Sequence, residues 1–255
     1  MRTPLVSIIT VSYNAAKTIE QTILSVINQT YTNIQYIIID GKSTDNTIDI
    51  VHKYKEHVSV LVSEKDNGIY DAMNKGISFA KGELIGIINA DDWYELDAVE
   101  TMVNMYNLQS NQTNCLYYGM LRIWREEKEY CVRQFHHNFV TETVIQHPTN
   151  FVPKVLYDRL GKFDTSFRIA ADFDLLNRFR INQVNFIKVD KIIANFREGG
   201  ASTTLAPKVL LEGPQIKLRY GLISNEEYIR ISQKYKKKTF FQRIKRAVKY
   251  LIYGC

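Results

Sequence analysis

Short apolar runs alternate with segments of helical periodicity along the first 95 residues of the chain. The runs are rich in β-branched residues, which is typical of strands buried on both faces of a parallel sheet. They lie at residues 5–12, 35–39, 58–62 and 84–88, and the segments with helical spacing lie between them, at 17–28, 48–54 and 69–77. With right-handed crossovers, this order predicts an α/β fold in which helices flank a mostly parallel sheet.

Three of the predicted strands end in polar residues, at 10–14, 40–43 and 89–92. Open α/β sheets bind ligands at the carboxyl ends of their strands, so we expect these segments to converge on one binding edge. An aromatic ring from Tyr13, an acidic acceptor from Asp40 and a carboxylate pair suit the base and diphosphate of a nucleotide. The glycine-rich signatures of dinucleotide dehydrogenases and P-loop NTPases are absent from the sequence, which disfavours both classes.

The carboxylate pair is Asp91 and Asp92, directly after the apolar run that ends at Ile88. Adjacent carboxylates repel each other unless a cation or strong donors hold them. Hard oxygen ligands of this kind suit Mg²⁺ or Mn²⁺, which in turn bind phosphates. The alternative is that one of the two acids caps a helix that begins near Glu95.

Four motifs together resemble the family 2 glycosyltransferases of the GT-A fold. They lie at residues 6–14, 39–45, 67–76 and 89–92, and the resemblance runs from about residue 4 to residue 200. It implies a Rossmann-like GT-A domain with a mostly parallel, mixed sheet flanked by helices. It also implies a metal-dependent, inverting transfer of a sugar from a nucleotide donor.

The resemblance assigns roles to residues by position. It implies nucleotide contacts from Thr10, Ser12, Tyr13, Asn14, Asp40, Lys75 and Asp91, with Lys75 near the diphosphate. Asp91 and Asp92 correspond to the metal and donor-sugar carboxylates, with Asp92 as the more direct metal ligand. Family members often have a third acid where this chain has Asn89, whose amide oxygen remains available to sugar hydroxyls or a bound water.

The middle of the chain predicts two strands, at 115–124 and 130–135, joined by a charged turn. The spacing of the histidines there does not match a known metal site, so we expect solvated loop or acceptor-side residues. They are His136, His137 and His147. Similar family members carry His or Gln near the donor in the segment of His147, so we take it as a donor-side or acceptor-side candidate.

An inverting transfer needs a carboxylate that takes the proton from the acceptor hydroxyl. Asp172 and Asp174 compete for this role at the start of a predicted helix. Arg178 follows Asp174 at the spacing of a helical ion pair, which favours a structural role for Asp174. Asp172 matches the second position of the family's Glu-Asp signature, whose first position is Ala171 here, so we predict Asp172 as the base. Asp172 also has the alternative interpretation of a helix N-cap.

Residues 185–189 and 192–196 predict two further strands, followed by a loop at 197–202. This loop resembles the flexible Gly-Gly-x-Ser segment of related transferases, which implies donor or acceptor contacts from Gly199, Gly200 and Ser202. Two glycines permit such movement, and an ordinary surface loop is the alternative.

Charge is unevenly distributed along the 255 residues. The net charge is +6, yet residues 234–255 hold eight basic residues and no acid, so the remainder carries −2. A slightly acidic body argues against a nucleic-acid partner. The three cysteines, Cys115, Cys131 and Cys255, indicate a reducing compartment, and with no signal-like or membrane-spanning segment we expect a cytoplasmic protein.

The last residues combine an apolar stripe, including Phe240, Ile244 and Leu251, with a basic face. This pattern is typical of a helix that lies on an anionic membrane surface, here through residues 236–255. A helix that packs on the body or on a partner is the alternative.

Together these features predict a GT-A domain over residues 1–205, with a nucleotide-sugar half at about 1–95 and an acceptor half at about 96–205, and a helical extension over 206–255. We expect transfer from a UDP-sugar, with Mn²⁺ or Mg²⁺, to a glycan or polyprenyl-diphosphate-linked saccharide at the inner face of a bacterial membrane. The product would be an O-antigen, capsule or exopolysaccharide. The alternatives are a sugar-1-phosphate nucleotidyltransferase and a non-catalytic sugar-nucleotide-binding subunit.

Overall fold

The computed structural model describes residues 2–199 and 211–235. The chain divides into two compact units, Met1–Thr204 and Leu205–Cys255, and each is described by itself. In the second unit, the described residues form helix α8 (Glu212–Arg219) and a helical segment at 225–235. In the described part of the chain, no helix is both long enough and apolar enough to cross a membrane.

Strands and helices alternate over the first 90 residues or so, as the sequence predicts. The strands are β1 (Val6–Ser12), β2 (Ile34–Asp40), β3 (Val60–Ser63), β4 (Leu84–Asn89), β5 (Trp93–Tyr94), β6 (Cys115–Arg125), β7 (Lys128–Arg133), β8 (Asn150–Pro153) and β9 (Asn185–Arg197). The helices are α1 (Ile19–Ile27), α2 (Thr47–His52), α3 (Ile69–Phe79), α4 (Ala98–Leu108), α5 (Lys154–Leu160) and α6 (Ala171–Ile181). Single 3₁₀ turns are η1 (Lys55–His57), η2 (Gln112–Asn114), η3 (His137–Phe139) and η4 (His147–Thr149).

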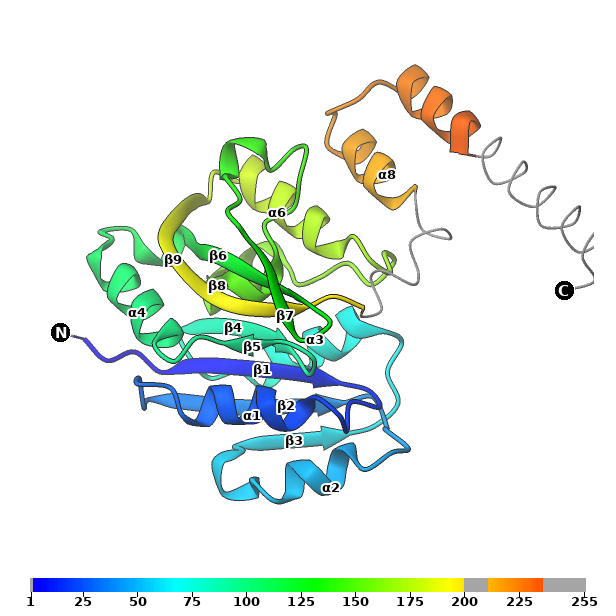
Figure 1. Ribbon diagram of the computed structural model, residues 1–255. Coiled ribbons are helices and arrows are strands. Elements are labelled where there is room, and N and C mark those ends of the chain that lie inside the picture. The colour runs from blue at the N-terminus through cyan, green and yellow to red at the C-terminus, as the bar shows by residue number, and fades with distance from the viewer. Residues whose placement is uncertain (1, 200–210, 236–255) are drawn as a thin grey trace, which may run out of the picture. The chain divides into compact units, whose positions relative to one another are not determined.

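These strands form one mixed sheet with the order β3-β2-β1-β4-β8-β6-β9-β5, and β7 pairs with β6 (Figure 1). The strands β3, β2, β1 and β4 are mutually parallel. β8 runs antiparallel to both β4 and β6, and β9 runs parallel to β6. The α/β fold with a mixed sheet and flanking helices is therefore confirmed.

Helices cover both faces of the parallel part of the sheet. Successive residues of a strand point to opposite faces, and in β1 both Ile8 and Ile9 are fully buried. Ile8 belongs to the core cluster that contains Ile23 of α1. Ile9 lies against α3, where a Cβ added to Gly76 would sit 2.4 Å from its Cγ2 atom. The two-sided cover explains why the strands appear as uninterrupted apolar runs.

The expectation of two strands at 185–189 and 192–196 is wrong. Both segments belong to the single strand β9, which pairs with β6 along its length. The pairing register shifts near Met120 of β6, and such an irregularity lets one strand continue past residues that break its apolar pattern.

Candidate active site

The three polar strand tips lie together, as the sequence predicts. Ser12 of β1 is paired with Asp40 of β2, and Val11 is paired with Asn89 of β4. Beyond the strands, the Gly41 amide donates to the Ser12 carbonyl at 2.8 Å. The loops after β1, β2 and β4 thus begin side by side at one edge of the sheet.

Asp40 is fully buried at the centre of this edge. Its carboxylate accepts four hydrogen bonds: from Ser12 Oγ (3.0 Å), Ser43 N (2.8 Å), Ser43 Oγ (2.5 Å) and Ser63 Oγ (2.7 Å). These bonds tie the ends of β1, β2 and β3 together. A base N–H would have to replace one of these donors before Asp40 could read it.

The loops after β1 and β2 are joined by side-chain contacts. Asn14 has a φ of 49°, a left-handed conformation that asparagine tolerates. Its amide donates to Ser43 Oγ and its side-chain oxygen accepts from the Thr44 amide, both at 2.8 Å. Thr10, in contrast, is buried and shares a hydrogen bond with the Tyr36 hydroxyl, so its side chain lies in the core.

The side chains of Tyr13 and Asp66 both lie close to Gly41. A Cβ added to Gly41 would sit 2.4 Å from Asp66 Oδ2 and 3.3 Å from the Tyr13 ring, so a larger residue here would displace the Asp66 carboxylate. Tyr13 is 64% exposed, an unusual state for a large aromatic side chain. We call Tyr13, Gly41 and Asp66 the Gly41 cradle. It offers an open aromatic face and an acidic acceptor at the binding edge.

The two acids after β4 differ in exposure. Asp92 is fully buried, and its carboxylate accepts from the Arg197 amide at 3.2 Å and from Asn89 Nδ2 at 3.5 Å. Burial raises the pKa of Asp92 well above its usual value, and the Asp91 charge adds to the rise. Asp91 is only partly buried, and burial raises its pKa against the opposing charge of Arg197. Asp91 is therefore the acid that an incoming cation can reach.

The carboxylate of Asp91 fits a metal ion that is also bound by a substrate. In residues 2–199 and 211–235, no group of three or more His, Cys, Asp or Glu side chains could hold a metal on its own. Mg²⁺ in phosphate sites takes one or two carboxylates, with waters and substrate phosphates completing the shell. Asp91 is a partly buried carboxylate with a raised pKa, and a cation would stabilise its charged form.

His147 lies beside Asn89. Its Nε2 atom is 3.3 Å from Asn89 Oδ1, in the turn η4 before β8. Burial lowers the His147 pKa to about 4, so the imidazole is neutral near pH 7 and Nε2–H donates to the amide oxygen. His136 and His137 lie at the start of the turn η3. Their rings stack with centres 4.6 Å apart, and the Tyr118 hydroxyl is 2.9 Å from His137 Nδ1.

Of the remaining predicted residues, Lys75 lies in α3 and Gly199 lies just after β9. Lys75 forms ion pairs with Glu64 (2.9 Å) and Asp71 (3.7 Å), so its charge already has partners. Gly199 has a φ of +117° in the turn after β9, a conformation that suits glycine. Gly200, Ser202 and the helix expected at 236–255 lie outside the described residues.

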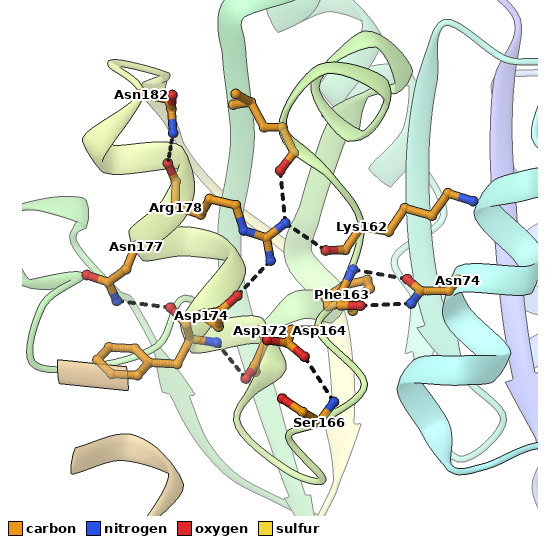
Figure 2. Close-up of polar contacts among 12 residues, drawn as sticks. Asn74, Lys162, Phe163, Asp164, Ser166, Asp172, Asp174, Asn177, Arg178 and Asn182 are labelled. Atoms are coloured by element: carbon orange, nitrogen blue, oxygen red, sulfur yellow. Dashed lines mark hydrogen bonds and ion pairs between the residues drawn. The ribbon is translucent and has the colours of Figure 1, made fainter. Parts of the chain in front are cut away.

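Asp172 is the second residue of α6, whose N-cap is Ala170. Its Oδ1 atom accepts from the Phe173 amide at 2.8 Å (Figure 2) and from the Tyr70 hydroxyl at 3.3 Å. Tyr70 is in the first turn of α3, which follows the carboxyl end of β3. This contact joins Asp172 to the edge of the sheet where the strand tips converge.

The ion pair predicted between Asp174 and Arg178 is confirmed. Its side chain is fully buried, and its carboxylate pairs with Arg178 at 2.6 Å (Figure 2). Arg178 also donates to the carbonyls of Leu160 (2.9 Å) and Lys162 (2.8 Å). Asp174 therefore fixes the loop before α6, whereas Asp172, two residues earlier, lies only partly buried at the helix start.

Sequence reasoning missed two residues at this edge. Arg197 supports Asp92 through its amide, and its Nη1 atom donates to the Asp91 carbonyl at 3.3 Å. Tyr70 lies inside one of the family-like motifs, but nothing local indicates that it contacts Asp172. Both contacts join residues more than 100 positions apart, so no local pattern could have found them.

Known proteins resemble this chain in sequence. A family profile described as Glycosyl transferase family 2 matches residues 7–173. An uncharacterized glycosyltransferase of Rickettsia prowazekii is 30% identical over 195 residues, which cover 72% of this chain and 61% of that protein. The hyaluronan synthase of Pasteurella multocida is 29% identical over 211 residues, covering 80% of this chain and 21% of the synthase. The chain thus spans less than two thirds of the length of either relative.

Solved structures resemble it in fold. TarS from S. aureus, in complex with UDP-GlcNAc, has a TM-score of 0.69 at 16% identity and covers 92% of this chain and 72% of its own. The mannosyltransferase PcManGT from Pyrobaculum calidifontis, with GDP-Man and Mn²⁺, has a TM-score of 0.58 at 18% identity, covering 98% of this chain and 87% of its own. The profile match covers more than half of the chain, and the chain belongs to glycosyl transferase family 2.

Proposed function

We propose that this chain is an inverting glycosyltransferase that moves a sugar from a UDP-sugar to a hydroxyl of a glycan or lipid-linked saccharide. One observation carries the proposal: a single sheet edge holds the Gly41 cradle, the acid pair and, through Tyr70, the carboxylate of Asp172. Family membership supports sugar transfer and argues against the alternative of a nucleotidyltransferase. The complex of TarS with UDP-GlcNAc supports a UDP-linked donor.

The donor would lie along this edge. The exposed Tyr13 ring is suited to stack on the base, and Gly41 beside it adds no side chain. Asp91, with Asn89 beside it, would hold Mg²⁺ or Mn²⁺; when bound, the ion offsets the charge of the diphosphate as the nucleotide leaves. We propose Asp91 as the direct ligand in place of Asp92, because Asp92 is fully buried.

Asp172 would act on the acceptor. As the acceptor oxygen attacks the anomeric carbon, its proton passes to the Asp172 carboxylate and the bond from that carbon to the diphosphate oxygen breaks. Attack from the face opposite the leaving group inverts the configuration. The hydrogen bonds from Tyr70 and Phe173 to Oδ1 orient the carboxylate.

Replacement of Asp172 by Asn tests the base. We expect kcat to fall by about 10²–10⁴-fold, since the amide cannot accept the proton, while UDP binding is retained. Asp158→Asn is the matched control, because Asp158 is an exposed carboxylate in α5 that pairs with Lys154. Full turnover in Asp172→Asn would reject the base assignment.

A thermal-shift screen of UDP-sugars with Mn²⁺ tests the donor class, because a ligand that binds the folded state raises the melting temperature. A chain that binds a UDP-sugar but neither transfers nor hydrolyses it would be a non-catalytic binding subunit. The proposal would be rejected if no nucleotide sugar raised the melting temperature.

The sequence of the extension at 206–255 supports a proposal for the acceptor and the location. Its basic, apolar sequence supports attachment of residues 236–255 to the cytoplasmic leaflet, where a polyprenyl-diphosphate-linked acceptor would lie. Liposome flotation of the full chain and of a chain that ends at residue 238 tests this attachment. Equal binding by both would reject it.

A further inference from the structure

Arg197 lies beside the turn that carries the acid pair. It is the last residue of β9, and its guanidinium group donates to the Asp91 carbonyl at 3.3 Å and to Gln21 Oε1 at 2.8 Å. Both acceptors are neutral oxygens, so these bonds orient the guanidinium without neutralising its charge. The Arg197 side chain keeps 22% of its surface exposed.

Aromatic packing holds this guanidinium in place. Its Cζ atom lies 5.2 Å from the centre of the Trp93 ring, a distance typical of a cation–π contact. Trp93 packs in turn against Trp124, with ring centres 5.5 Å apart. Trp124 is fixed by a hydrogen bond from Nε1 to Asn195 Oδ1 at 2.8 Å. Arg197 is thus pre-organised at the edge of the acid pair.

Besides its electrostatic interaction with Asp91 and Asp92, Arg197 forms an ion pair with one exposed acidic side chain, and this pair is weak. Its Nε atom is 3.6 Å from Glu127 Oε1, and Glu127 is 82% exposed in the turn between β6 and β7. Water screens such a pair and makes it weak. An anionic ligand at this edge can therefore replace Glu127 at little cost.

The acid pair alone would repel a diphosphate, because carboxylates and phosphates carry the same sign of charge. A cation beside the pair reduces this repulsion, and the planar fork of arginine matches two phosphate oxygens at once. We infer that Arg197 binds the diphosphate of the nucleotide donor and of the nucleoside diphosphate product. The inference rests on the proposed function and adds a specific phosphate-binding residue to it.

Titration calorimetry of UDP and of uridine, in the presence of Mg²⁺, tests this role in Arg197→Gln. We expect UDP to bind about tenfold or more weakly, the size of one lost charge-assisted hydrogen bond, while uridine binding is unchanged. Arg197→Lys keeps the charge without the fork and is expected to recover part of the UDP affinity. The main-chain amide that supports Asp92 is present in both variants.

Arg125→Gln is the matched control. Arg125 is an exposed residue at the end of β6 that pairs with Glu198 at 2.7 Å and covers the Tyr130 ring. Its loss is expected to leave UDP affinity unchanged. Unchanged UDP binding in Arg197→Gln, or equal losses for UDP and uridine, would overturn the role of Arg197. A wild-type chain that does not bind UDP would instead overturn the proposed function and this inference with it.

Discussion

Replacement of His147 by Gln is expected to reduce the loss of unfolding free energy that the protein shows as the pH falls. Burial lowers the pKa of the folded imidazole from its ordinary 6.5 to about 4, whereas the unfolded chain binds the proton with the ordinary value. The His147 contribution to stability is therefore complete above pH 6.5 and is lost as the pH falls from 6.5 towards 4. Glutamine keeps a donor for Asn89 and never gains a charge.

The size of the effect follows from the two pKa values. At about pH 4.5 the unfolded imidazole is almost fully protonated and the folded one is mostly neutral, which costs the folded state up to about 2.5 kcal/mol. In His147→Gln this loss is absent, while the loss from titrating carboxylates is common to both proteins. The stability of the wild type relative to the variant should therefore fall by up to about 2.5 kcal/mol between about pH 7 and pH 4.5.

Urea unfolding of both proteins across this pH range measures the difference, because the midpoint and slope give the free energy of unfolding at each pH. His57→Gln is the control, because it makes the same replacement at an exposed histidine. Parallel pH profiles for the wild type and His147→Gln would refute the reasoning. An NMR titration that places the pKa of His147 near 6.5 would refute it as well.

Two further predictions concern packing at and behind the site. Gly76→Ala should lower the free energy of unfolding by about 1–3 kcal/mol, because the new methyl group would sit 2.4 Å from Ile9 Cγ2 in a filled core. Urea unfolding measures the loss, and an unchanged midpoint would show that α3 can move away. Arg178→Ala should cost about 3–5 kcal/mol, because it leaves the buried charge of Asp174 without its ion pair. Calorimetric melting measures the loss, and a loss no larger than that of an exposed ion pair would contradict it.

The parallel half of the sheet was predictable because each of its strands is an apolar run that ends in polar residues. β5 and β8 were not, because two and four residues are too few to show a period. β9 was split in the prediction because Asp190 and Lys191 interrupt its apolar pattern, yet both belong to the strand. Hydrogen bonding to β6 outweighs local sequence there.

Two features of the site were predictable from local sequence: the convergence of the strand ends and the ion pair of Asp174. The ends of β1, β2 and β4 converge because parallel strands end at one edge, and the spacing of Arg178 distinguished Asp174 from Asp172. The state of each carboxylate was not predictable. One of the four donors to Asp40 is Ser63, which comes from β3. The amide that donates to the buried Asp92 belongs to Arg197, which comes from β9.

The departure at Asn89 has a physical reason in the structure. Its amide oxygen accepts from His147 Nε2, while its nitrogen lies 3.5 Å from Asp92 Oδ2 as a donor. An aspartate at this position could accept from His147 but could not donate to Asp92, and it would add a third negative charge beside two acids whose pKa values burial already raises. The amide therefore suits a neutral His147 and a buried Asp92 together, and it leaves Asp91 as the accessible carboxylate of the turn.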